Sequence, residues 1–300
     1  MNIKDHFLTK ETFRIERDEK TGVLATRPIP ENLSTYYDAK NYRSHGSQQK
    51  GLIDRMYSAA KALRTKSKRR LVEKYHNSFD SVLDIGCGDG AFMSVFEDKR
   101  IVGVEPSARA RELCVKKGLE ATASISDINE TFDVITLWHV LEHLPNLVED
   151  LKMLMSLLSD QGRLFIAVPN CKSWDAEFYG EFWAGYDVPR HVWHFDRESL
   201  ESTLVSAGFE IAGQEPQIFD LFYVAYLSEK YKGGRFALSR GVLVGIYAVL
   251  TKKASKKPSA LLFVAKKAKQ GGLRSLLSIN HKQIGQNPKN PLKEPLQAPL

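Results

Sequence analysis

The stretch that decides the fold is a glycine-rich turn, Asp84-Ile85-Gly86-Cys87-Gly88-Asp89-Gly90. It follows the apolar run Ser81-Val82-Leu83 and precedes a helix-like segment at residues 91–96, so the pattern predicts a strand, a turn and a helix. Glycine has no Cβ atom and tolerates positive φ, which lets the backbone at such a turn approach a nucleotide-like ligand closely. Glu105 closes the next apolar run, residues 101–104, and is placed to accept hydrogen bonds from ribose hydroxyls.

The turn is compatible with two kinds of ligand. Its glycines, together with Glu105, also satisfy the loose dinucleotide-binding fingerprint. Asp84 separates the two ligands, because a pyrophosphate here would lie beside a carboxylate of the same charge. S-adenosylmethionine has no phosphate and carries a sulfonium and an ammonium group, which an acidic side chain attracts. The turn therefore favours this methyl donor; the alternatives are an NAD-linked protein and a turn that binds no ligand.

Strands and helices alternate through the middle of the chain. Expected strands are residues 81–85, 101–104, 121–122, 133–138 and 163–168, and expected helices are residues 51–78, 91–96, 108–117 and 147–158. This alternation predicts a parallel sheet with helices on both faces. Asp196 can cap a further helix that Gly208 ends, and two last strands are expected at residues 209–218 and 259–265.

Several segments, in order along the chain, resemble the motifs of class I S-adenosylmethionine-dependent methyltransferases. They are residues 82–90, 103–107, 132–146, 162–170, 189–195 and 207–209. The branch that they resemble is the bacterial group similar to ubiquinone-biosynthesis O-methyltransferases. This resemblance implies an α/β, Rossmann-like, seven-stranded and mostly parallel sheet whose last strand is antiparallel. It also implies S-adenosylmethionine as the cofactor.

The donor is expected beyond the carboxyl ends of the strands. The predicted donor-binding residues are Asp84, Gly86, Cys87, Gly88, Glu105, Pro106, Ser126, Asp127 and Trp138. Asp84 is assigned to the methionine amino group and Glu105 to the ribose. Ser126 and Asp127 are assigned to adenine, because the family places a polar contact after the third strand. Trp138 either packs against the donor or belongs to the core.

Two histidine-containing segments are the candidates for the acceptor side. His139-Val140-Leu141-Glu142-His143 spells the inverted zinc-protease motif, but it follows a strand directly and Pro145 comes soon after it. We therefore predict no metal here, although some relatives use such positions with a divalent ion. His139 and His143 are candidates for acid–base chemistry or substrate orientation, with a structural role as the alternative.

The second segment contains Arg190, His191 and His194, after a stretch rich in aromatic residues at 178–186. An arginine and two histidines among aromatic side chains predict a wall for an aromatic or anionic acceptor. His191 and His194 are candidate bases, since the ordinary pKa of histidine is near 6.5. A loop held by its own hydrogen bonds is the alternative.

Composition sets the remaining expectations. The net charge is +7, and the basic residues gather at 61–70 and 252–257, as solvated faces or as sites for an anionic partner. Three distant cysteines fit a cytoplasmic protein. The most apolar run, residues 241–250, is about half the length of a membrane-spanning helix, so a buried or interfacial helix is expected, with peripheral membrane contact as one alternative.

Four regions are expected along the chain. Residues 1–50 form a cysteine-free, zinc-ribbon-like extension that ends in a lid at residues 36–45, and residues 51–266 form the donor-binding domain. Residues 220–251 are a helical insertion, and residues 267–300 are a mostly disordered tail. The predicted function is methyl transfer to a small-molecule acceptor by in-line displacement, with O-methylation favoured. An RNA methyltransferase and a non-catalytic donor-binding module are the alternatives; the oligomeric state stays open.

Overall fold

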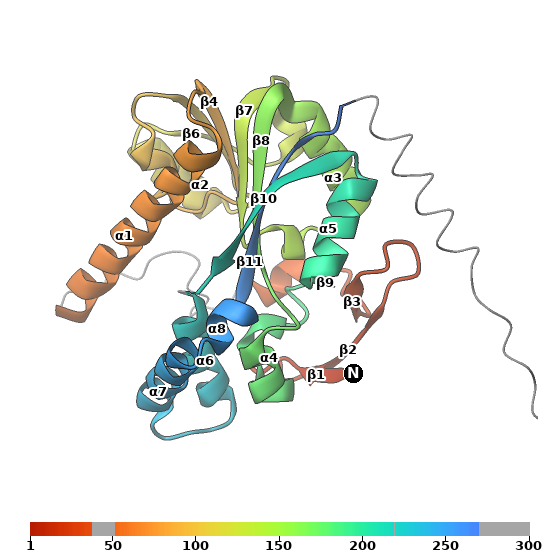
Figure 1. The fold of residues 1–300 in the computed structure, drawn as a ribbon, viewed down its shortest axis with the longest axis vertical. Coiled ribbons are helices and arrows are strands. Elements are labelled where there is room, and N and C mark those ends of the chain that lie inside the picture. Colours follow the sequence, from red (N-terminus) through yellow and green to blue (C-terminus); the bar gives the residue numbers. More distant parts are fainter. Residues whose placement is uncertain (38–51, 219, 270–300) are drawn as a thin grey trace, which may run out of the picture. The chain divides into compact units, whose positions relative to one another are not determined.

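The computed structural model describes residues 1–37, 52–218 and 220–269. Most of the expected lid and residues 270–300 of the expected tail lie outside these ranges. Two sheets organise the described chain: a seven-stranded sheet that contains the glycine turn, and a four-stranded sheet built mainly from the N-terminal residues (Figure 1).

The seven-stranded sheet has the order β10-β11-β8-β7-β4-β5-β6. Its strands are β4 (Ser81–Ile85), β5 (Arg100–Val104), β6 (Glu120–Thr122), β7 (Phe132–Trp138), β8 (Leu158–Pro169), β10 (Phe209–Gln217) and β11 (Ala260–Lys267). The ladders among β6, β5, β4, β7 and β8 are parallel, and β11 is antiparallel to both of its neighbours. The expected fold class is thereby confirmed.

The strands are apolar on both faces, as a sheet covered on both sides requires. In β4, Val82 belongs to one buried cluster and Leu83 to another, because successive side chains point to opposite faces. Helices α3 (Leu147–Leu157) and α5 (Arg197–Ser206) pack their leucines on the Leu83 face, and Val72 of α1 (Leu52–Tyr75) packs on the Val82 face. Figure 1 shows these helices on either side of the strands.

The helix ends follow local chemistry. Ser107 caps α2 (Ala108–Lys116) by accepting a hydrogen bond from the Ala110 amide, and Asp196 caps α5 as predicted. The helix expected at residues 91–96 is wrong: only one 3₁₀ turn forms there, η2 (Met93–Val95). Its apolar side chains are drawn in different directions, since Met93 enters one buried cluster while Phe92 and Phe96 enter another.

The second sheet joins distant parts of the chain. Strands β1 (Asn2–Lys4), β2 (Thr12–Arg17) and β3 (Leu24–Arg27) form an antiparallel meander, and β3 pairs with β9 (Trp193–His194). The N-terminal strands thus hold the histidine segment that follows β8.

The remaining helices are α4 (Trp174–Tyr179), α6 (Asp220–Tyr231), α7 (Ala237–Leu250) and α8 (Lys253–Lys256). In the sequence, α6 and α7 lie between β10 and β11 and are joined through Gly233 and Gly234. In space, the two helices pack against each other. Within the described ranges, no helix combines the length and the apolar character that crossing a membrane requires.

Candidate active site

The glycine turn lies at the carboxyl end of β4, and its two central glycines have different neighbours. Both have positive φ, +70° at Gly86 and +57° at Gly88, a region that other L-residues adopt at a cost. A Cβ atom at Gly86 would lie 2.4 Å from Cγ2 of Val140, whereas one at Gly88 would meet no described atom within 4 Å. Gly86 is therefore required by protein packing, and Gly88 faces open space where a ligand can approach the backbone.

Glu105 lies at the end of β5, next to the turn. Its two carboxylate oxygens accept hydrogen bonds from the Gly88 amide at 3.0 Å and from the Ser107 amide at 2.9 Å. The side chain is buried beside the turn, and each oxygen keeps a second lone pair. This position suits the predicted contact with ribose hydroxyls.

Asp84 lies deeper, at 2% exposure, under the turn. Thr136 of β7 donates a 2.6 Å hydrogen bond to it. Burial raises the pKa of Asp84 to about 7, although the Thr136 hydrogen bond and the charge of Lys68 oppose the shift. A nearby cation stabilises the ionised form of a carboxyl group with such a raised pKa.

Trp138 closes β7, and its ring faces a cationic side chain of the protein itself. The Lys68 ammonium lies 4.4 Å from the centre of the Trp138 ring, and interacts electrostatically with Asp84 and Asp220. An aromatic face beside carboxylates attracts cationic groups. The indole N–H of Trp138 is also buried without a hydrogen-bond partner among the described residues. These features fit a ligand that carries a sulfonium and an ammonium group.

The other predicted donor contacts differ in what they can offer. The Cys87 side chain is buried with Met93 and Cys114, and burial raises the pKa of its thiol, so only its backbone faces the turn. Pro106 is exposed after Glu105. Ser126 and Asp127 lie exposed in the 3₁₀ turn η3 (Ile125–Asp127), where Asp127 accepts a hydrogen bond from the Ser124 amide. Their contact with adenine stays a prediction.

His139 follows Trp138 and has a positive φ of +58°. Its Nε2 atom lies 3.0 Å from Oδ2 of Asp220, and its Nδ1 atom lies 3.5 Å from Oε1 of Glu142. Burial lowers the pKa of His139, but the two carboxylates outweigh burial and raise it to about 9. His139 is therefore a cation at neutral pH and cannot accept a proton.

Glu142, His143 and His191 converge next to His139. Each histidine places Nδ1 near a backbone carbonyl, His143 at 2.9 Å from Arg190 O and His191 at 2.8 Å from Gly185 O. A carbonyl only accepts, so Nδ1 carries a hydrogen and, in a neutral ring, the lone pair lies on Nε2.

Glu142 is 1% exposed, and its two oxygens have no hydrogen-bond partner within the described parts of the chain. The three side chains offer ligand atoms within 4.8 Å of one another, so they can hold a cation or act on a proton. His139 and His143 do not share an α-helical face, because η4 (Leu141–His143) is a single 3₁₀ turn.

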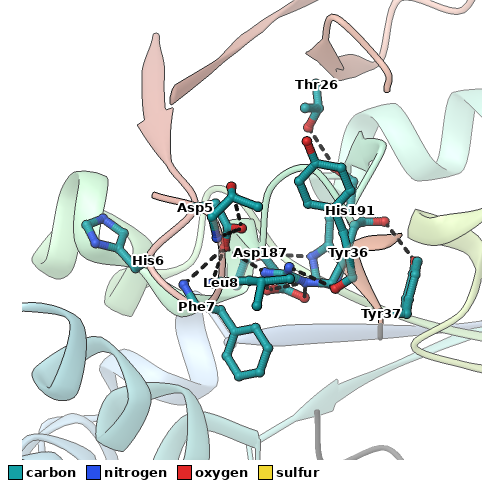
Figure 2. Close-up of polar contacts among 12 residues, drawn as sticks. Asp5, His6, Phe7, Leu8, Thr26, Tyr36, Tyr37, Asp187 and His191 are labelled. Atoms are coloured by element: carbon teal, nitrogen blue, oxygen red, sulfur yellow. Dashed lines mark hydrogen bonds and ion pairs between the residues drawn. The ribbon is translucent and has the colours of Figure 1, made fainter. Parts of the chain in front are cut away.

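The expectation that Arg190 meets an anionic acceptor is wrong. Its side chain is fully buried and donates hydrogen bonds to Asp187 and Asp5. Figure 2 shows these two carboxylates close together, with Tyr37 farther away at the right of the group. The Tyr37 hydroxyl lies 2.9 Å from His143 Nδ1, so the N-terminal segment directly contacts the histidine cluster.

The expected aromatic wall is also largely wrong. Tyr179, Trp183 and Tyr186 are buried in one cluster with Ile3, Phe13 and Ile15 of the small sheet, because that sheet needs an apolar partner. His194 is 4% exposed, and its Nε2 atom lies 2.9 Å from the Thr26 hydroxyl, which in turn donates to His191 O. Burial lowers the pKa of His194 to about 3. These contacts indicate a structural role for His194.

Comparison with known proteins identifies the family. A family model described as a methyltransferase domain matches residues 56–214, more than half of the chain. The chain belongs to this methyltransferase family. The predicted resemblance to class I enzymes is confirmed, and S-adenosylmethionine is the cofactor of that class.

Two curated proteins show partial similarity to this methyltransferase. An uncharacterized protein of Methanocaldococcus jannaschii is 31% identical over 104 residues, which are 33% of this chain and 46% of that protein. The ubiquinone biosynthesis O-methyltransferase of Aeromonas salmonicida is 29% identical over 102 residues, 30% of this chain and 43% of that enzyme. The chain thus spans less than half the length of the curated relatives it matches.

Solved structures agree with the methyltransferase fold. The plantazolicin methyltransferase BamL, in complex with a triazolic desmethylPZN analog and SAH, superposes with a TM-score of 0.52 at 19% identity over 79% of this chain and 95% of that chain. Magnesium protoporphyrin IX methyltransferase from Synechocystis PCC 6803, with bound SAH, gives a TM-score of 0.50 at 13% identity over 78% and 97%. At these identities the likeness supports the fold alone.

Sequence reasoning missed several residues of this methyltransferase site. Lys68 was counted in a basic surface run, yet it lies against Trp138; in the same run, Arg64 pairs with Asp220 and Arg69 with Glu73. These contacts within the protein occupy some of the basic side chains that an RNA partner would need. Asp220 gave no local signal, because its link to His139 spans 81 residues.

Proposed function

We propose that the protein transfers the methyl group of S-adenosylmethionine to a hydroxyl group of a small molecule. The observation that carries this proposal is the orientation of His191: its Nδ1 bonds to Gly185 O, which leaves Nε2 to take a hydroxyl proton near the Glu142 carboxylate. His191 Nε2 lies 4.0 Å from Glu142 Oε1. Glu142 also contacts His139, which directly follows Trp138 of the donor side.

The donor-side residues would bind the cofactor in complementary ways. Asp84 and the Trp138 ring attract its cationic groups, Glu105 accepts hydrogen bonds from hydroxyls, and Gly88 admits it to the backbone. When bound, S-adenosylmethionine supplies a methyl group on a positively charged sulfur. The acceptor oxygen would displace that sulfur in line, so that the sulfur leaves as a neutral thioether. The chain mainly aligns the nucleophile and excludes water.

His139, His143 and His191 have different roles on the acceptor side. His139 is protonated at neutral pH and orients Glu142. Burial lowers the pKa of His143 to about 4, which makes it a poor base and a neutral hydrogen-bonding group. His191 is therefore the base that we propose. Burial raises the pKa of Glu142, but it lies below its ordinary value because cationic His139 opposes burial, so its carboxylate can balance the charge that His191 acquires.

The two halves of the proposal need separate measurements. For the donor half, calorimetric titration with S-adenosylhomocysteine should show weaker binding by Asp84→Ala and Glu105→Ala; unchanged affinity in both variants would refute the site. For the acceptor half, a screen of hydroxylated small molecules with labelled S-adenosylmethionine should identify a product. On that product His191→Asn should lower kcat about a hundredfold or more, while His194→Asn serves as the matched control.

Chelation separates a histidine base from a metal site at the same residues. If His191 acts as the base, turnover after dialysis against EDTA stays unchanged. A loss of turnover that a divalent cation restores would replace the base with a metal ion held by Glu142, His143 and His191. Donor binding without turnover on any acceptor would favour a non-catalytic module.

A further inference from the structure

Helix α7 presents an unusually apolar surface to solvent. Leu238, Leu243 and Leu250 are 66%, 65% and 77% exposed. Other exposed apolar side chains on or next to the helix are Phe236, Val242, Ile246, Tyr247 and Val249. Isolated apolar residues are common on protein surfaces, but a contiguous patch of this kind marks an interaction site.

The opposite face of α7 explains why these side chains point outward. Gly241, Gly245 and Ala248 are the buried residues of the helix. A Cβ atom at Gly241 would lie 2.7 Å from the Tyr226 backbone, and one at Gly245 would lie 2.5 Å from the Phe222 ring. This stripe of small residues packs tightly on α6, so most of the bulky residues at the other helical positions face away from it. Val244 packs on a buried cluster, and the Tyr247 ring contacts Trp174.

The length of the helix limits what can cover it. Helix α7 has 14 residues, so it extends about 21 Å, which is too short to cross a bilayer that needs about 20 residues. A helix with one packed side and a broad apolar outer side can lie in the plane of a membrane interface.

Charge around the helix selects an anionic surface. From residue 230 to residue 257 the sequence contains eight Lys and Arg and no Asp or Glu. Arg235 precedes α7 and Lys252 and Lys256 follow its end, all exposed, whereas Arg240 pairs with Glu229. Basic residues at the edges of an apolar face attract anionic lipid headgroups while the apolar side chains enter the interface.

We propose that the outer face of α7 docks on the surface of an anionic lipid bilayer. Two other occupants are less compatible with the charges. A second copy would bring the same basic rim against itself. Residues 270–300 carry four Lys and Arg against one Glu, so they repel this rim as well. The inference does not depend on the proposed acceptor chemistry.

Vesicle sedimentation tests the inference on the full chain. Vesicles of phosphatidylglycerol and phosphatidylcholine should bind the protein more strongly than pure phosphatidylcholine vesicles, and binding should fall as salt is raised. Leu243→Asn with Leu250→Asn should reduce partitioning about tenfold or more. Lys252→Ser with Lys256→Ser should reduce it about fivefold per lysine. Val115→Asn, which changes an equally exposed valine on α2, should change nothing.

Each variant is also titrated with S-adenosylhomocysteine. Unchanged affinity shows that the fold and the donor site are intact, so failure of the lipid proposal is distinguishable from failure of the proposed function. The inference is overturned if the wild-type chain stays in the supernatant with anionic vesicles, or if the double leucine variant binds them as well as the wild type does. It is also overturned if the leucine substitutions only convert a dimer to a monomer.

Discussion

The two central glycines of the turn allow one prediction to be worked through from the structure. Gly86→Ala and Gly88→Ala both place a Cβ atom on a residue with positive φ, which costs about 1–2 kcal/mol in each case. They differ in their surroundings, because only the new methyl at position 86 meets Val140, at 2.4 Å. Overpacking of this kind adds about 1–3 kcal/mol. Gly86→Ala should therefore be the less stable variant by that amount.

A double-mutant cycle isolates the clash. Val140→Ala removes the two methyl groups that the new side chain would touch, so it should cost about 1–3 kcal/mol less in the Gly86→Ala background than in the wild type. Urea unfolding measures all four free energies. Equal destabilisation of the two glycine variants, with no coupling to Val140, would refute the reasoning.

The same pair separates folding from ligand binding. Gly88 faces open space, so Gly88→Ala should fold but bind S-adenosylhomocysteine at least tenfold more weakly, because the methyl occupies the approach to the backbone. Calorimetry at a temperature well below the unfolding midpoint, where the variant is fully folded, gives the affinity. Wild-type affinity in this variant would mean that the ligand does not approach the turn at Gly88.

Three further predictions concern charged groups. Arg190→Met removes the partner of the buried Asp5 and the half-buried Asp187 and should cost about 3–5 kcal/mol of stability in urea unfolding, and a cost below about 1 kcal/mol would show that they find other partners. The pKa of His139 is about 9 in the folded state, above its ordinary value of 6.5, so its pairing with Asp220 stabilises fully below pH 6.5 and is lost as the pH rises through 9. The stability difference between wild type and Asp220→Asn should shrink from pH 6.5 to pH 9.5, and a constant difference would contradict this pKa. Glu105→Gln replaces one of two accepting oxygens with an NH2 group, so it should cost about 1–3 kcal/mol of stability and weaken S-adenosylhomocysteine binding about tenfold by calorimetry; equal affinity would remove Glu105 from the ribose site.

Much of the donor side could be predicted because its signals are local. The turn needs glycines where φ is positive, and the flanking runs need apolar residues because both faces of the sheet are covered. Ser107 and Asp196 begin helices through hydrogen bonds to residues only a few positions away. The failed helix at residues 91–96 shows the limit, since its apolar pattern was real but its side chains serve two different clusters.

The acceptor side could not be predicted in the same way. The pairing of Leu24 with His194 and the bond between Asp5 and Arg190 join residues that are far apart in the sequence. No local pattern announces such partners. Arg190 therefore resembled a substrate ligand until the structure placed it between two carboxylates.

The sequence by itself determined the order of strands and helices, the glycine turn with its distal carboxylate, and through them the methyl donor. Those features depend on residue type and spacing over short stretches. Only the tertiary structure decided which backbone carbonyl each histidine contacts, that Lys68 lies against Trp138, and that α7 leaves its leucines exposed. Proton affinity and exposure depend on burial and on the charges nearby, and folding brings those neighbours from remote parts of the chain.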